Sequence, residues 1–210
     1  LTEGFFLFVS LGEKPARGKE KPIQAYKVLE ASTRRTRFDV SAERGLTPFV
    51  GRQRELELLL DGLERVKTGH GQAFSIVSEA GLGKSRLLHE FRKAIRNENV
   101  AFLEGKCISY GKGLSYHPII EILKSAFEIA EEDRDTTIKE KVRTGLASLA
   151  ADQSAVLPYI LGLLSVKDSG VDQIMMSPEG KRDQNTEALK QIVLRGSQIR
   201  PLILVVEDLH

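Results

Sequence analysis

The spacing of hydrophobic positions changes along this chain and divides it into three segments. In residues 1–30, apolar and aromatic side chains gather in two stretches on either side of Arg17-Gly18, which predicts two strands joined by a turn. Residues 31–46 keep no sustained period and predict a linker. From residue 47 on, apolar residues recur at helical spacing or in short continuous runs, so helices and strands should alternate.

The third segment predicts an α/β fold. Helical spacing of apolar residues indicates helices within 56–66, 87–95, 118–127, 135–166 and 189–193. Short apolar runs indicate buried strands at 73–77, 100–103 and 202–206, since strands covered on both faces are nearly continuously hydrophobic. The polar stretch 177–184 should lead into the last helix. This alternation predicts a three-layer architecture around a mostly parallel sheet, preceded by the hairpin.

A glycine-rich loop follows the expected strand 73–77 and opens the next helix. Its sequence, SEAGLGKS from Ser78 to Ser85, matches the P-loop pattern G-x-x-x-x-G-K-[ST] except that a serine replaces the first glycine. Backbone N–H groups from Ala80 onward should form a concave nest for phosphate at a helix N-terminus. Lys84 should reach the β- and γ-phosphates, and the Ser85 hydroxyl should ligate magnesium. The chain is therefore predicted to be a P-loop NTPase.

The alternative for this loop is an ordinary glycine-rich turn in which Lys84 is merely solvated. The Gly-Lys-Ser triplet, with an apolar strand pattern before it and an amphipathic helix pattern after it, favours the phosphate site. Lys84 is also expected to be catalytic. The residues expected to contact the nucleotide are consecutive: Ser78, Glu79, Ala80, Gly81, Leu82, Gly83, Lys84, Ser85 and Arg86.

Two adjacent acids, Glu207 and Asp208, follow the apolar run 202–206. This arrangement is typical of a Walker B strand, in which one carboxylate orients magnesium and its neighbour polarises the attacking water. By position, Glu207 is assigned to the magnesium shell and Asp208 to catalysis, with the reverse assignment open. The alternative is a solvated acidic pair at a strand end, which the P-loop upstream disfavours.

Composition narrows the setting of the protein. Hydrophobic residues make up 41% and charged residues 29% of the 210 residues, as in ordinary globular domains. The net charge of +2 is too balanced to indicate nucleic-acid binding, and the arginine cluster of the linker is better explained by solvent exposure. The single cysteine, Cys107, excludes an internal disulfide and favours a cytoplasmic protein. No apolar run approaches the roughly 20 residues that a membrane helix needs.

Residues 47–210 resemble the N-terminal part of an AAA/STAND-type P-loop ATPase module, through Phe49-Val50-Gly51-Arg52, the loop 78–85 and the stretch 201–210. Modules of this kind occur C-terminal to class III adenylate/guanylate cyclase domains and in some large transcriptional regulators. The Phe-Val-Gly-Arg segment is similar to the one that wraps the adenine in that family. The resemblance therefore implies ATP and Mg²⁺ as cofactors, and adds Val50, Gly51 and Arg52 to the expected nucleotide contacts.

Residues 5–29 resemble the closing hairpin of a class III cyclase catalytic domain, through Leu11-Gly12-Glu13, Arg17-Gly18, Pro22 and Tyr26. The metal-binding aspartates of such a domain would lie upstream of Leu1, so this chain is not expected to make cyclic nucleotide. Both ends of the chain suggest a piece of a longer polypeptide. The expected division is a cyclase hairpin over 1–30, a linker over 31–46 and an ATPase domain over 47–210 that is incomplete at its C-terminus.

These resemblances imply an ATP-binding regulatory switch in a multidomain signalling protein, with neighbouring domains of the same polypeptide as its partners. One alternative is a nucleotidyl cyclase that this module tunes. Another is an origin-recognition-type DNA-binding AAA protein, against which the balanced charge and the cyclase-like hairpin count. The family's polar sensor, helical lid and basic finger would lie beyond His210, and a finger arginine contributes about 10³–10⁵ in rate. ATP hydrolysis by this chain is therefore expected to be very slow.

Overall fold

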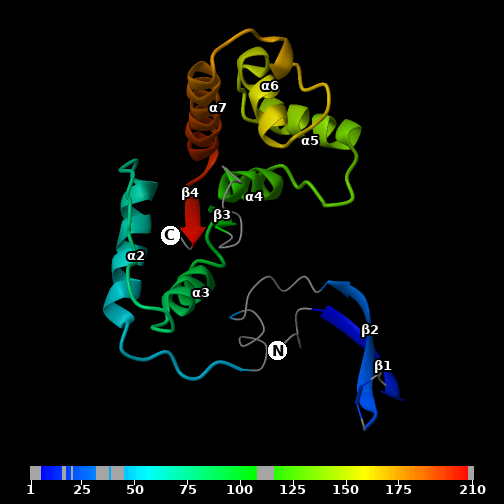
Figure 1. Cartoon of the computed structure of the whole chain (residues 1–210). Helices are drawn as coiled ribbons and strands as arrows, with labels where there is room; N and C mark the ends of the chain where they lie inside the picture. Colours follow the sequence, from blue (N-terminus) through cyan, green and yellow to red (C-terminus); the bar gives the residue numbers. More distant parts are fainter. Residues whose placement is uncertain are drawn as a thin grey trace. The chain divides into compact units, whose positions relative to one another are not determined.

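A computed structural model describes residues 6–15, 18–19, 21–31, 38, 45–107 and 116–207 of the chain. Backbone contacts divide the chain into two compact units. The first contains Leu1–Glu64 and Gln72–Ala94, and the second contains Arg65–Gly71 and Ile95–His210. Figure 1 shows the helices and strands of both units.

The first described element is an antiparallel hairpin of β1 (Phe6–Lys14) and β2 (Ile23–Ala31), which confirms the two strands predicted near the N-terminus. Gly18 lies between them with φ +80°, a left-handed conformation that glycine adopts without strain. The rings of Phe8 and Tyr26 meet edge to face across the pair, with centroids 6.2 Å apart.

Two helices follow in the first unit, and both were predicted from helical spacing. Helix α2 (Gln53–Lys67) buries Leu59 and Leu63, while helix α3 (Lys84–Ala94) buries Leu87 and Phe91. In each helix the buried residues are four positions apart and therefore lie on one face. The polar face of α3 stays available for other contacts.

The predicted buried strand at 73–77 is wrong for this structure. Residues 73–77 have no regular secondary structure, and among the described residues no strand pairs with them. A strand exists only as a ladder of hydrogen bonds to a neighbour, so an apolar run alone does not create one. Val77 is 87% exposed, and the ring of Phe74 lies against Gly62 of α2 rather than in a sheet.

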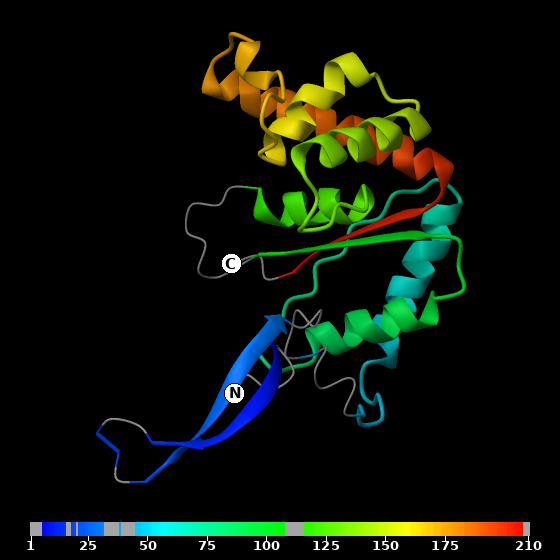
Figure 2. The same ribbon diagram turned by 90° about the vertical axis from the view of Figure 1, so that its right-hand side faces the viewer.

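The second unit contains a parallel pair of strands, β3 (Ala101–Lys106) and β4 (Leu202–Glu207). Their register runs from Ala101 opposite Leu202 to Lys106 opposite Glu207. Helix α4 (His117–Ala126) packs along β3, as Figure 2 shows, and has Pro118, the predicted helix-start proline, in its first turn. Both strands match predicted ones, although β3 continues three residues further and β4 is half-buried rather than fully covered.

A bundle of helices forms the hydrophobic core of this unit (Figures 1 and 2). It consists of α5 (Asp135–Ser148), α6 (Gln153–Leu163), the short 3₁₀ helix η1 (Val171–Gln173) and α7 (Pro178–Ile199). The core also takes in the C-terminal part of α4. Its buried residues are Leu123, Phe127, Val142, Leu146, Val156, Tyr159, Ile160, Leu161, Val166, Val171 and Ala188.

Helix α7 begins earlier than its hydrophobic pattern indicated, because its first two turns are polar. Ser177 caps it by accepting a hydrogen bond from the backbone N–H of Gly180, and Pro178 occupies the first turn. Of the predicted mostly parallel sheet, the described residues show one parallel pair, β3 and β4, and they do not show three layers. Within those residues, no helix is long and apolar enough to cross a membrane.

Candidate nucleotide-binding site

The glycine-rich loop enters helix α3 directly. Gly81 and Gly83 have φ values of +83° and +85°, where a side chain would strain the backbone. Helix α3 begins at Lys84, so the first N–H groups of α3 come immediately after the second glycine. The loop therefore favours glycine at both positions, and the helix start that follows presents the positive end of a dipole.

Lys84 folds back over the loop that precedes it. Its Nζ atom donates hydrogen bonds to the backbone oxygens of Ser78, at 2.7 Å, and of Glu79, at 3.2 Å. The Lys84 ammonium therefore lies on the inner side of the turn from Ser78 to α3. A cation in this position can serve an anion held by the same turn, since its three donors can be redistributed among acceptors.

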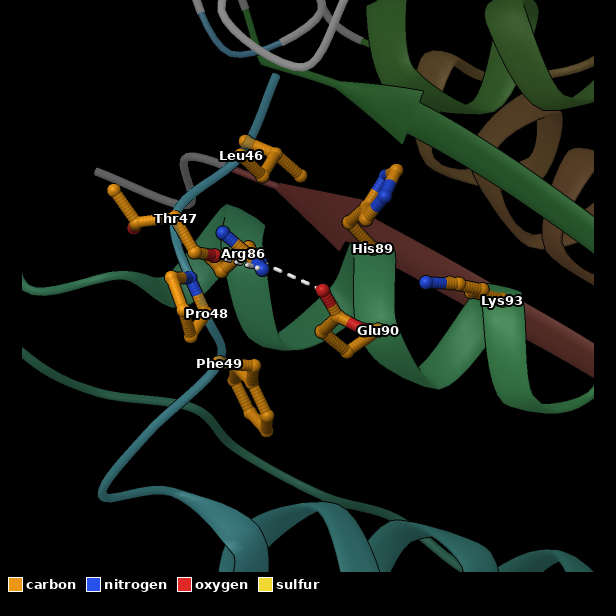
Figure 3. A pocket seen from close by; sticks show the side chains of 8 residues that line it. All are labelled: Leu46, Thr47, Pro48, Phe49, Arg86, His89, Glu90 and Lys93. Atoms are coloured by element: carbon orange, nitrogen blue, oxygen red, sulfur yellow. Dashed lines mark hydrogen bonds and ion pairs between the residues drawn. The ribbon is translucent and has the colours of Figure 1, made fainter.

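A pocket lies beside the polar face of α3 (Figure 3). Its volume is about 540 Å³, within the range of small-molecule sites. One wall is the segment from Leu46 to Phe49, and the other is α3, which contributes Arg86, His89, Glu90 and Lys93. The helix that lines this pocket, α3, is also the helix that follows the glycine-rich loop.

Arg86 ties the two walls of this pocket together. Its Nη2 atom donates to the backbone oxygen of Thr47 at 2.8 Å, and its Nε atom pairs with the Glu90 carboxylate at 2.7 Å. The guanidinium also lies over the Phe49 ring, 5.8 Å from its centroid. Both charged side chains are mostly covered, with 19% and 14% exposure.

The predicted base contacts Val50, Gly51 and Arg52 follow this wall and lead into α2. Val50 is 74% exposed, Gly51 has φ +79°, and the Arg52 carbonyl accepts the N–H of Leu56. The pocket is thus lined by the residues just upstream of these three. Its α3 side could have been found from the sequence, because positions 86, 89, 90 and 93 share one helical face.

Glu207, the first residue of the predicted acidic pair, lies at the end of β4 in the second unit. Glu207 is the last residue of the strand and stands opposite Lys106 in the parallel register. The Lys106 ammonium is 3.9 Å from the Glu207 carboxylate and 3.0 Å from that of Glu104. Asp208, the predicted catalytic acid, lies outside the described residues. The structure thus brings Ser78–Arg86 together in one segment and places Glu207 on a strand end.

The family comparison covers most of the chain: the family model of the AAA ATPase domain matches residues 48–210. The chain belongs to the AAA ATPase domain family. That match supports the predicted P-loop ATPase module and an α/β fold, while residues 1–47, including the hairpin, lie outside it. The AAA ATPase family implies ATP, usually with Mg²⁺, as the ligand of such a domain.

An uncharacterized protein of Rhizobium meliloti (strain 1021) is 26% identical over 209 residues. The match covers 98% of this chain but 20% of the relative, so the AAA ATPase chain spans about a fifth of that protein's length. No solved structure matches.

The side chains fit the cofactors that the family implies. Each of the two predicted magnesium ligands carries an oxygen that suits a hard cation: the Ser85 hydroxyl at the start of α3 in the first unit, and the Glu207 carboxylate at the end of β4 in the second. The positive-φ glycines and the Lys84 ammonium suit an anionic phosphate chain.

Proposed function

We propose that this AAA ATPase domain binds Mg-ATP at the loop Ser78–Ser85 and acts as a regulatory switch within a larger signalling protein. The observation that carries the proposal is the conformation of the loop. Gly81 and Gly83 have positive φ, α3 begins directly after them at Lys84, and the Lys84 ammonium hydrogen-bonds back to the Ser78 carbonyl of the same turn.

Each proposed ligand contact follows from the chemistry of its side chain. Backbone N–H groups at the start of α3 donate hydrogen bonds to the phosphate oxygens, and Lys84 neutralises the terminal phosphates. Ser85 and Glu207 supply oxygens to Mg²⁺, which in turn offsets the charge of the phosphate chain. Asp208 polarises the attacking water, or exchanges this role with Glu207.

The base is assigned to the segment that begins at Leu46 and continues through Val50, Gly51 and Arg52. Support comes from the pocket between Leu46–Phe49 and α3, and from the resemblance of Phe-Val-Gly-Arg to an adenine-wrapping segment. Arg86 belongs to the same assignment, at the base side of the site.

The signalling role rests on the hairpin that precedes the AAA ATPase domain. Its strand pairing is compatible with the closing hairpin of a cyclase domain, so we propose a cyclase-type neighbour as the partner that nucleotide binding repositions. Reading the frame upstream of Leu1 tests this part: two aspartates on strand ends at cyclase spacing would support it, and their absence would contradict it.

Nucleotide binding itself is tested by calorimetry with a non-hydrolysable ATP analogue and Mg²⁺. Lys84→Ala should abolish the binding heat, because it removes the ammonium from the phosphate loop. Lys190→Ala is the matched control: its side chain is 61% exposed on α7 and pairs with Glu187. Unchanged affinity in the Lys84 variant would contradict the phosphate site.

A further inference from the structure

Arg86 is placed against the electrostatics of its own helix. It is the third residue of α3, where the helix dipole favours anions, and the first turn of α3 contains no acidic residue. The arginine also precedes its helical partner Glu90, the less favourable order for an i,i+4 pair. Helix stability alone therefore does not account for an arginine at this position.

The guanidinium instead joins two segments 39 positions apart in the sequence. It donates to the Thr47 carbonyl and lies over the Phe49 ring, while Glu90 holds its Nε edge. The planar guanidinium can make both hydrogen bonds at once with fixed directions, as Figure 3 shows for its position between the two walls. A second ring contact on the same helix joins Phe38 to His89, with centroids 5.4 Å apart.

We propose that Arg86 is a positioning residue for the base side of the nucleotide site. It fixes the segment Leu46–Phe49 on α3 two positions after Lys84, so that the base-binding segment and the phosphate loop move as one body. This inference rests on the proposed function, because it assumes that a nucleotide occupies the loop. It assigns to Arg86 an indirect role, through Thr47 and Phe49, rather than contact with phosphate.

The test compares two ligands that differ in the base: Mg-bound non-hydrolysable ATP analogue and Mg-bound inorganic triphosphate. Both are titrated calorimetrically into the full chain and into Arg86→Gln. The base-side segment loses its hydrogen bond from Arg86 to the Thr47 carbonyl and the guanidinium contact over Phe49, which should weaken the ATP analogue about tenfold. The affinity for triphosphate should stay within about twofold, because the loop and Lys84 are untouched.

Matched variants separate positioning from a simple loss of charge. Arg86→Lys keeps the charge but lacks the guanidinium fork, so it should behave like Arg86→Gln. Glu90→Ala frees the Nε edge and should weaken the ATP analogue several-fold with triphosphate unchanged. Arg92→Gln, an exposed arginine on the same helix, should leave both affinities as they are. Far-UV circular dichroism monitors folding, and the Glu90 variant decides the question should the Arg86 variants not fold.

The outcomes are distinct. Equal losses for both ligands in the Arg86 variants, or no loss for either, would overturn the positioning role while leaving nucleotide binding intact. Failure of the unmodified chain to bind either ligand would contradict the proposed function and this inference with it. A loss confined to the ATP analogue would support the assignment.

Discussion

Lys106 and Glu207 are register partners in the parallel β3–β4 pair, and the Lys106 ammonium lies 3.9 Å from the Glu207 carboxylate. Both side chains are partly covered, with 27% and 16% exposure. The residue proposed to hold magnesium therefore has a cation beside it. A divalent ion bound at Glu207 would compete with the Lys106 ammonium for the same carboxylate and be repelled by it. Lys106 is also paired with Glu104.

Replacing this lysine should strengthen magnesium binding. Lys106→Met removes a positive charge at a distance where two charges interact by about 1–4 kcal/mol before screening. Because both groups are partly exposed, we expect only a two- to fivefold drop in the Mg²⁺ concentration needed for half-maximal binding of a fluorescent ATP analogue. Lys190→Met serves as the control. An unchanged or raised requirement would argue that Glu207 is not a magnesium ligand.

The close approach of β3 and α4 gives a stability prediction. A Cβ at Gly105 would overlap the backbone carbonyl of Pro118, in the first turn of α4, and backbone cannot move aside as a side chain can. Gly105→Ala should therefore lower the free energy of unfolding by about 2–3 kcal/mol or more. Urea denaturation followed by circular dichroism measures this.

Gly71→Ala is the comparison for that experiment, because a Cβ there meets nothing within 4 Å. It should change the free energy of unfolding by less than about 0.5 kcal/mol. Similar values for the two variants would show that α4 does not pack against β3 as described.

The cap of helix α6 gives a pH-dependent prediction. The Ser154 hydroxyl, together with the backbone N–H groups of Ser154 and Ala155, donates to Asp152 and lowers the pKa of its carboxyl below the usual 3.8. A lowered pKa in the folded state means that the charged cap stabilises the fold above the unfolded pKa. This stabilisation is lost as the pH falls through the folded pKa.

Asp152→Ala should therefore lower the melting temperature by a few degrees at pH 7, and the difference from the unmodified chain should shrink below pH 3.8. Asp183→Ala, which removes an exposed carboxylate from α7, is the control. A difference that persists undiminished in acid would contradict the capping role of the charge.

Most helices could be predicted because their apolar residues repeat on one face. The spacing of Leu59 and Leu63, and of Leu87 and Phe91, marks the buried sides of α2 and α3. The start of α7 could not be located in this way, because Ser177 and Pro178 are start signals without any hydrophobic period. The strand predicted at 73–77 was wrong because an apolar run, although typical of a strand, does not by itself form one. Strand formation also depends on a neighbouring strand, which the local sequence does not encode.

The candidate site, too, could be predicted only where its signal is local in the sequence. A local motif was enough to predict the loop Ser78–Ser85 and the helix that follows it, because Gly81 and Gly83 set the turn into α3. The wall from Leu46 to Phe49 was missed as a pocket, because its contacts with α3 join residues 39 positions apart. The role of Arg86 between the two walls depends on that tertiary contact and has no local signature.

Helix α6 is apolar on nearly every side, with Val156 and Ile160 completely inaccessible to solvent and Pro158 inside the helix. From Val156 onward no side chain of α6 is exposed, and the helix packs against α5, η1 and α7. Helix α6 therefore depends on these neighbouring helices for its stability. The stretch from His117 to Ile199, whose α4 end contributes Leu123 and Phe127 to the same core, should melt as a single cooperative block, and shortened versions of the protein should keep that block whole or omit it altogether.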